Sequence, residues 1–290
     1  MQQARRCLSL FAVAALTCGL SGNPPIDAAH AENGLSAPSR ISAVYRVMLG
    51  SLNLGDFRLT ATFHGEDYEM RGEGRFSVLL GLIYEWRGVT AGKGRVTSTG
   101  PEPAMYSFSY SDSAKMGERL RLTFSDGNVT GVSIIPNRPP IPQTIPVTQE
   151  QLEDVLDPMS GAFLTAQSDN PNGDLNVCNH TLPVFDGRQR FDLVVTPKRS
   201  VHVKRTTPTG YGGPAVICKV KFIPIAGYHP DNPAVRLMAQ TNEIEAWLVP
   251  LRGTNMYVPY RIVLPTLAGY GTAEVTSLRV SGSRRASAEP

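Results

Sequence analysis

The sequence predicts a nearly all-β protein, a large curled antiparallel sheet that is barrel-like or spiral, with one or two short helices and a central helix at or inside its mouth. From Ile41 onward, apolar and polar residues alternate with the period of two that strands require. Gly, Pro, Asp and Asn interrupt this alternation roughly every ten residues, which is typical of strands joined by turns. Because so many twisted strands do not form a flat open sheet, we expect the sheet to curl or close.

The first half of the chain has the pattern of a strand meander. Residues 56–63 alternate cleanly, Gly65-Glu66-Asp67 predicts a turn, and a second alternating run extends from Tyr68 to Phe76. Ser125-Asp126-Gly127-Asn128 predicts another turn, since glycine adopts a positive φ at little cost. The other strands expected in this half are 82–91, 105–110, 119–124 and 129–135.

The middle of the chain interrupts this pattern. Five prolines between Pro136 and Pro146 fix φ and cannot donate hydrogen bonds, so we expect an extended strap. In residues 149–166, which we call the central segment, apolar residues recur at helical spacing, and Thr148 and Gln151 have the spacing of a capping box. We therefore expect one kinked helix or two consecutive helices whose apolar face packs against the inside of the sheet.

Strands resume in the second half. Asp186-Gly187 predicts a two-residue hairpin turn between strands at 177–185 and 188–196. Asn232-Pro233 predicts the start of a short helix. The other strands expected here are 201–206, 215–224, 243–250, 257–264 and 272–280. We expect roughly thirteen to fifteen strands in all, and no linker divides residues 41–280, which predicts a single domain.

The N-terminal residues 1–31 have the pattern of a cleavable signal peptide. A basic pair precedes an apolar stretch from Cys7 to Leu20, and small residues predict cleavage after Ala31. The stretch is shorter than the roughly 20 residues that a membrane span needs, so we expect export to the periplasm without a transmembrane segment. An alternative is a lipoprotein cleavage site at Ala15-Leu16-Thr17-Cys18. We expect residues 32–40 to be a flexible segment and 281–290 to be a disordered tail.

Cysteine count predicts a disulfide. Of the four cysteines, Cys7 and Cys18 leave with the signal peptide, so Cys178 and Cys218 enter an oxidising compartment together. We expect them to form a disulfide, and two separate buried thiols are the alternative.

The composition bounds the function classes. The 290 residues are 41% hydrophobic and 18% charged, which is typical of a folded chain. Lys plus Arg (28) nearly balances Asp plus Glu (25), so the net charge supplies no strong field for nucleic acid or anionic lipid. We expect no nucleic-acid partner.

Three stretches of the sequence resemble a known family. They are Val155–Phe163, Val184–Leu193 after Cys178, and Pro224–Tyr228 after Cys218. The chain resembles the bacterial envelope proteins of domain of unknown function 3108. The resemblance implies a periplasmic, β-rich protein with no assigned reaction and no established catalytic residues. On architecture alone it also resembles curled-sheet lipoprotein carriers and the β-spiral proteins that support envelope integrity.

The sequence holds no recognisable catalytic motif. There is no Gly-x-Ser-x-Gly pattern, and the histidines after residue 31 are scattered without metal-ligand spacing, so we expect no enzyme activity, no metal and no cofactor. Alternation places Asp186, Arg188, Arg190 and Asp192 on one strand face. The arginines could bind an anion, or the four residues could form an ion-pair ladder. Asp157 precedes a proline and fits a helix cap better than a catalytic acid.

Apolar side chains on the expected strands could line a cavity for an acyl chain, or they could fill a packed core. The candidate lining residues are Phe57, Leu59, Phe63, Met70, Phe76, Trp86, Phe108 and Trp247. The leading hypothesis is a non-enzymatic periplasmic protein that holds a hydrophobic or lipidic ligand, or an envelope partner, in its curled sheet. The alternatives are an interaction scaffold for envelope integrity and a cell-wall or lipid hydrolase that uses Asp157, Asp186 and His180.

Overall fold

The computed structural model describes residues 38–282 except 79–83, 98, 113–115, 138–141, 167–172 and 252–253. The predicted signal peptide and most of the two flanking segments lie outside the described residues. At both ends the strands extend two or three residues beyond the predicted 41–280, since the first begins at Pro38 and the last ends at Gly282.

The described part is nearly all β, as the sequence predicts. Its strands are β1 (Pro38–Leu49), β2 (Leu52–His64), β3 (Asp67–Val78), β4 (Tyr84–Val96), β5 (Pro101–Asp112), β6 (Met116–Ser125), β7 (Asn128–Ile135), β8 (Leu164–Thr165), β9 (His180–Phe185), β10 (Arg190–Val203), β11 (Gly213–Ala226), β12 (Ile244–Pro250), β13 (Met256–Thr266) and β14 (Gly269–Gly282). The helical elements are α1 (Pro233–Gln240) and three 3-10 turns, η1 (Glu150–Leu152), η2 (Ser160–Ala162) and η3 (Leu175–Cys178).

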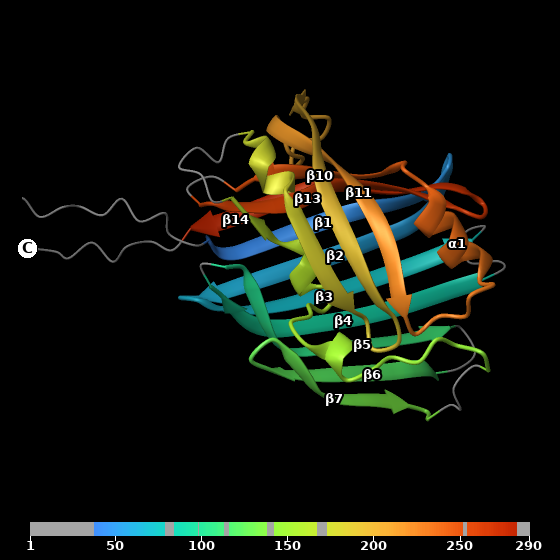
Figure 1. The fold of residues 1–290 in the computed structure, drawn as a ribbon. Coiled ribbons are helices and arrows are strands. Elements are labelled where there is room, and N and C mark those ends of the chain that lie inside the picture. Colours follow the sequence, from blue (N-terminus) through green and yellow to red (C-terminus); the bar gives the residue numbers. More distant parts are fainter. Residues whose placement is uncertain are drawn as a thin grey trace, which may run out of the picture. The chain divides into compact units, whose positions relative to one another are not determined.

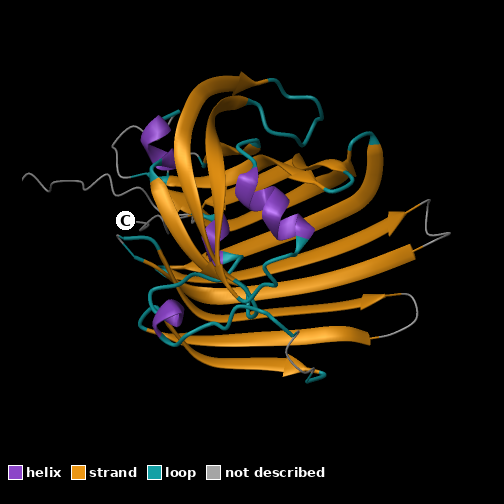
Figure 2. Ribbon diagram, turned by 45° about the vertical axis from the view of Figure 1, so that its right-hand side comes forward, coloured by secondary structure: helices purple, strands orange, loops and turns teal. Residues whose placement is uncertain are grey.

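All fourteen strands belong to one antiparallel sheet. Its order is β7-β6-β5-β4-β3-β2-β1-β14-β13-β12-β11-β10-β9, and the short β8 pairs with β13 off this path. Each half is therefore a meander, and the pairing of β1 with β14 joins the two halves (Figure 1). The path ends at β7 and β9, so the described sheet is curled but open (Figure 2).

Contacts other than direct pairing of β7 with β9 bridge the opening between the two ends of the sheet. The turn after β9 reaches β6, where Arg188 pairs with Glu118 and Gly187 lies against Leu120. The central segment fills the remaining gap, because Leu156 bridges to Val184 of β9 and the Val155 N–H donates to the Gly127 carbonyl at 3.0 Å.

The central segment corrects one prediction, because it contains no α-helix. Its helical content is η1 and η2, and the backbone between them is drawn into strand pairing. The Leu156 N–H donates to Pro183 O at 2.8 Å, and the Phe185 N–H donates to Leu156 O at 2.9 Å. These long-range bonds override the local helical spacing. The apolar residues are buried as expected, including Val155, Met159 and Phe163.

Smaller differences concern turns and strand lengths. The turn at Asp186 has four residues, closed by the Asp186 N–H on Gln189 O at 3.1 Å, and not the predicted two. The strands predicted at 188–196 and 201–206 form one strand, β10, with a register shift near Pro197. The helix predicted at Asn232 is confirmed as α1, and the Asn232 side chain caps it by accepting from Ala234 N and Val235 N.

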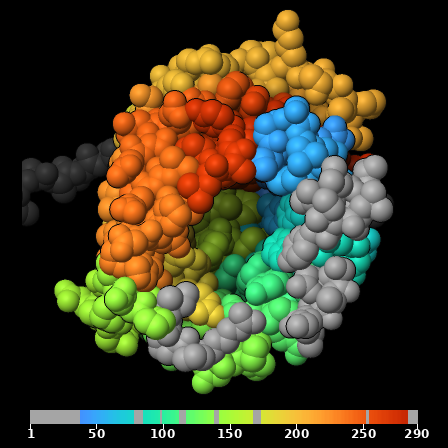
Figure 3. Space-filling view, turned by 90° about the vertical axis from the view of Figure 1, so that its right-hand side faces the viewer, coloured from blue at the N-terminus to red at the C-terminus, as the bar shows by residue number. Residues whose placement is uncertain are grey.

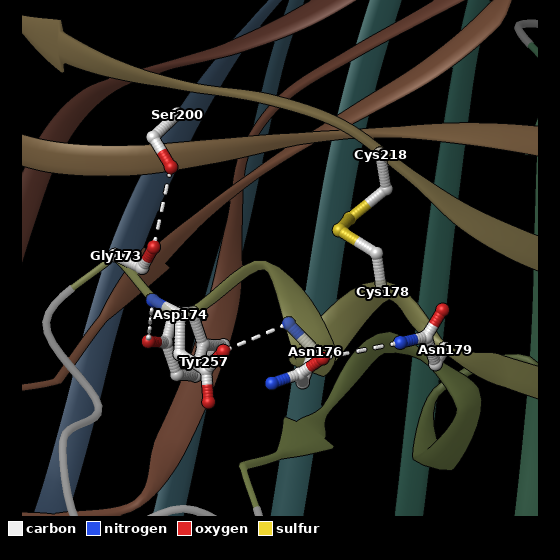
Figure 4. Close-up of a disulfide and its surroundings, with 8 residues drawn as sticks. All are labelled: Gly173, Asp174, Asn176, Cys178, Asn179, Ser200, Cys218 and Tyr257. Atoms are coloured by element: carbon white, nitrogen blue, oxygen red, sulfur yellow. Dashed lines mark hydrogen bonds between the residues drawn. A yellow bond between two sulfur atoms is a disulfide. The ribbon is translucent and has the colours of Figure 1, made fainter.

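The predicted disulfide is present in the structure. Cys178 at the end of η3 joins Cys218 of β11, with both residues fully buried and their Cα atoms 5.5 Å apart (Figure 4). The Asp174 N–H donates to the Tyr257 hydroxyl at 3.3 Å close by. The disulfide and this bond fasten the segment before β9 to strands β11 and β13.

Candidate ligand-binding cavity

The inner face of the curled sheet is a single continuous surface, as strand register shows. Ala246 of β12 lies opposite Ile262 of β13, which lies opposite Ala273 of β14. Across the junction with β1 and β2, the same row continues to Phe76 of β3 and Trp86 of β4. Residues from both halves of the chain therefore face one interior. Figure 3 looks into this interior and shows a hollow ringed by strands.

One wall of the interior borders a cavity of about 290 Å³. This volume is near the lower end of the roughly 300–1,000 Å³ typical of ligand pockets. Seventeen of the eighteen lining residues have uncharged, non-hydrogen-bonding side chains, and Glu245 is the exception. They are Pro158, Gly161, Ala162, Leu164, Leu182, Val184, Phe191, Leu193, Val195, Val220, Met238, Ile244, Glu245, Ala246, Leu248, Pro259, Ile262 and Leu264.

The other wall carries a band of half-buried aromatic side chains, which we call the aromatic wall. Trp86 is its centre, with its ring centroid 5.2 Å from that of Phe76, 6.2 Å from Phe108 and 6.0 Å from Tyr110. Phe57 of β2 lies beside it and contacts the ring of Tyr45 at 6.2 Å. Such a surface of offset rings suits apolar chains and rings.

Glycines on the inner face allow these rings to lie flat on the sheet. A Cβ added to Gly88 would lie 2.7 Å from Cη2 of Trp86, and one added to Gly74 would lie 2.5 Å from Cε2 of Phe76. A Cβ at Gly72 would likewise meet the ring of Phe57. Alternating glycines in these strands thus leave room for the faces of the rings. Glycine is otherwise unfavourable inside a strand.

The central segment, which lines the cavity through Pro158, Gly161 and Ala162, also carries a buried polar cluster. The Asp157 carboxylate is fully buried, and its Oδ1 accepts from Met159 N at 2.8 Å and Ser160 N at 3.1 Å. Its Oδ2 accepts from the Ser160 hydroxyl, which also bonds the Tyr68 hydroxyl at 2.6 Å. The Asp157 side chain therefore accepts backbone N–H groups at the start of the η2 turn, as a helix cap would, although the N-cap residue of this turn is Met159.

Burial dominates the electrostatics of this cluster. It raises the pKa of the Asp157 carboxyl, although the hydrogen bonds from Ser160 and Met159 oppose the shift. It also raises the pKa of Tyr68, and that of Tyr106 to about 12. All three groups thus favour their neutral forms more than they would in water.

The predicted lining residues divide into three groups. Phe57, Phe76, Trp86 and Phe108 belong to the aromatic wall, whereas Leu59, Phe63 and Met70 are buried in the hydrophobic core. Trp247 is a partly buried residue of β12, and none of the eight predicted residues is among those that line the cavity of about 290 Å³. The Trp247 Nε1 donates to Glu245 at 3.3 Å, and the Arg261 guanidinium lies 5.6 Å from the Trp247 ring centroid.

Both predicted anion-binding arginines are engaged by carboxylates. Arg188 pairs with Glu118 and Arg190 pairs with Asp192, each at 2.5 Å. Asp186 caps the turn, with its Oδ1 accepting from Arg188 N at 2.8 Å and Gln189 N at 2.6 Å, and burial raises its pKa. No hydrogen bond or ion pair joins Asp157, Asp186 and His180 within the part of the chain that the structure describes.

The sequence patterns did not reveal the wall formed by β9 to β13. Its residues alternate as strand residues do, but which faces meet depends on pairings between distant strands. The described residues contain no group of three or more His, Cys, Asp or Glu side chains arranged to hold a metal ion. No helix within those residues is long and apolar enough to cross a membrane.

The fold and the cavity together place this protein in a class of nearly all-β proteins in which a curled antiparallel sheet surrounds an apolar hollow. The chain belongs to the family described as Protein of unknown function (DUF3108), whose model matches residues 44–276. This confirms the family expected from the sequence.

No curated protein matches the chain. Among solved structures, it is similar to the crystal structure of a beta-barrel-like protein of domain of unknown function DUF1849 from Brucella abortus. The identity is 8%, the TM-score is 0.44, and the alignment covers 83% of this chain and 98% of that chain. No catalytic family is indicated by these comparisons.

Proposed function

We propose that this protein is a non-enzymatic carrier or holder of a hydrophobic ligand, such as a lipid acyl chain, in the periplasm. The observation that carries the proposal is the interior surface, where an apolar cavity and an aromatic wall belong to one inner sheet face. The signal-peptide pattern of residues 1–31 supports export. Burial of apolar ligand surface would supply the binding free energy, at roughly 25 cal/mol per Å² before the costs of association.

Native mass spectrometry of the protein purified without detergent from the periplasm tests the proposal. We expect to observe the mass of the protein with bound lipid, and only the mass of the protein alone after the lipid is removed by organic extraction. Ala246→Phe would place a ring in the cavity and should reduce the bound fraction, whereas Val280→Phe, at an exposed position outside the cavity, should not. Protein that carries no lipid and binds no fluorescent fatty acid afterwards would rule out the proposal.

Strand β7 supports a second candidate function, interaction with an envelope protein through strand addition. It ends the sheet order, and Val132 on it is 46% exposed. A terminal strand offers unpaired backbone groups to a partner strand. Photo-crosslinking from Val132 that recovers no reproducible partner would remove this candidate.

A further inference from the structure

Exposed apolar side chains gather at the end of the sheet where the hollow opens, which we call the mouth. Leu267 is 65% exposed, Tyr270 46% and Leu52 40%. Leu267 lies in the β13–β14 turn, and Tyr270 and Leu52 lie just after the β13–β14 and β1–β2 turns, at the starts of β14 and β2. The Gly50 N–H donates to Tyr270 O at 2.8 Å and joins the two turns. Ile135, 61% exposed, ends β7 at the same end of the sheet. Figure 3 views the molecule from this side.

Arginines lie on the outer face directly behind the mouth. Arg75 of β3 and Arg87 of β4 lie directly opposite each other, and both are exposed. Like charges in this position repel, and neither guanidinium forms an ion pair within the described residues. Exposed Arg46 lies in the same row, between Asp56 on one side and Glu274 on the other, and Asp56 separates it from Arg75. The exposed Glu85 and Glu243 lie at the same end, and Glu243 accepts a hydrogen bond from the Tyr270 hydroxyl.

The opposite end of the sheet has a different character. Its turns carry the exposed acids Glu66 and Asp126, and the exposed Arg40, Arg95 and Arg279 lie at the same end. Val280 is its one strongly exposed large apolar side chain in the described part. The two ends therefore differ in their exposed apolar side chains, and charged residues of both signs lie at each end.

We propose that the mouth docks onto a bilayer that contains anionic lipid. Leu52, Leu267 and Tyr270 would enter the headgroup region, where tyrosine and small apolar insertions are favoured. Arg75 and Arg87 would face the lipid phosphates. A bilayer suits these residues because they lie in or beside separate turns, whereas a protein partner would need a continuous complementary patch. The proposal goes beyond ligand holding and does not depend on it.

Vesicle flotation with the full chain tests the proposal. The protein should float with vesicles of phosphatidylglycerol and phosphatidylethanolamine, and far less with phosphatidylcholine vesicles. The double variant Leu52→Ser/Leu267→Ser should lower the bound fraction at least about five-fold, and Val280→Ser, at the opposite end, should leave it unchanged. Arg75→Glu/Arg87→Glu should lower it about ten-fold, whereas Lys93→Glu, further along the same strand β4, should have little effect.

Three results would overturn the proposal. In the first, the wild-type protein would stay in the unbound fraction with anionic vesicles. In a second, the mouth variants would bind as well as their controls at unchanged melting temperature. In a third, the wild type would elute as a dimer that Leu52→Ser/Leu267→Ser converts to a monomer, which would make the mouth a surface for self-association. None of these results bears on ligand holding, which the lipid content measured by native mass spectrometry tests separately.

Discussion

Arg188 in the turn after β9 and Glu118 of β6 form an ion pair, with Nη2 of the arginine 2.5 Å from Oε2 of the glutamate. Ten strands separate β6 from β9 along the hydrogen-bonded order of the sheet. Side chains, and not backbone pairing, therefore bring the two sides of the open sheet together at this point. The Glu118 side chain is 11% exposed, so the pair is partly shielded from water.

Arg188→Met should lower the free energy of unfolding by about 1–3 kcal/mol, because it leaves the mostly buried Glu118 carboxylate without its cation. Urea denaturation at neutral pH measures the change. Arg95→Met is the matched control, since Arg95 pairs with Glu102 at 3.2 Å where both side chains are well exposed. The control should cost less than about 1 kcal/mol. Equal losses for the two variants would show that closure does not depend on the Arg188 pair.

Gly88→Val should disturb the aromatic wall, because its Cβ would lie 2.7 Å from Cη2 of Trp86 and the ring must lift from the sheet. In a Trp247→Phe background Trp86 is the sole tryptophan, and its emission should shift with the substitution. We expect the affinity for a fluorescent fatty acid to fall about five-fold or more. Gly282→Ala is the control, since a Cβ there meets no atom within 4 Å. Unchanged tryptophan emission and unchanged affinity would show that the aromatic wall takes no part in ligand binding.

The strands could be predicted because their signal is local. Alternation in residues 56–63 and the turn at Gly65 define one hairpin without reference to the rest of the chain. The structure of the central segment could not be predicted in this way, because the helical spacing of Val155, Met159 and Phe163 fits a buried turn-rich segment equally well. What decides is the pairing of Leu156 with Val184, which depends on where β9 lies.

The candidate site shows the same division. The inward direction of Phe57, Phe76, Trp86 and Phe108 follows from strand alternation. The opposite wall depends on the junction of β1 with β14, strands at the two ends of the described chain, and on register shifts such as that between Val44 and Tyr45. A shift of one residue reverses which side chains face inward, and the sequence pattern does not mark it.

The disulfide between Cys178 and Cys218 should contribute about 4 kcal/mol to stability, since it closes a loop of 40 residues. Reduction of the denatured protein should add the mass of two hydrogens, and Cys178→Ala/Cys218→Ala should unfold at lower urea concentration. Wild-type protein measured in reductant is the control and should match the variant. A variant as stable as the oxidised wild type would show that the bond is not needed for folding.

Asp157→Asn should change how stability depends on pH. Because burial raises the folded-state pKa of Asp157 above its ordinary value of 3.8, the folded protein holds this proton more tightly than the unfolded chain does. The stabilisation from this group is thus complete below about pH 4 and is lost as pH rises through the folded-state pKa. The loss has a slope of at most about 1.4 kcal/mol per pH unit.

Asparagine removes this titration while its side-chain oxygen can still accept from Met159 N and Ser160 N. The stability of Asp157→Asn relative to wild type should therefore increase as pH rises from about 4 toward neutrality. Urea titrations at several pH values measure the difference, and Asp154→Asn, an exposed position in the same segment, is the control and should show no such trend. A difference that is flat with pH would mean that the Asp157 carboxylate is ionised in the folded protein at no cost, so that its hydrogen bonds fully offset burial.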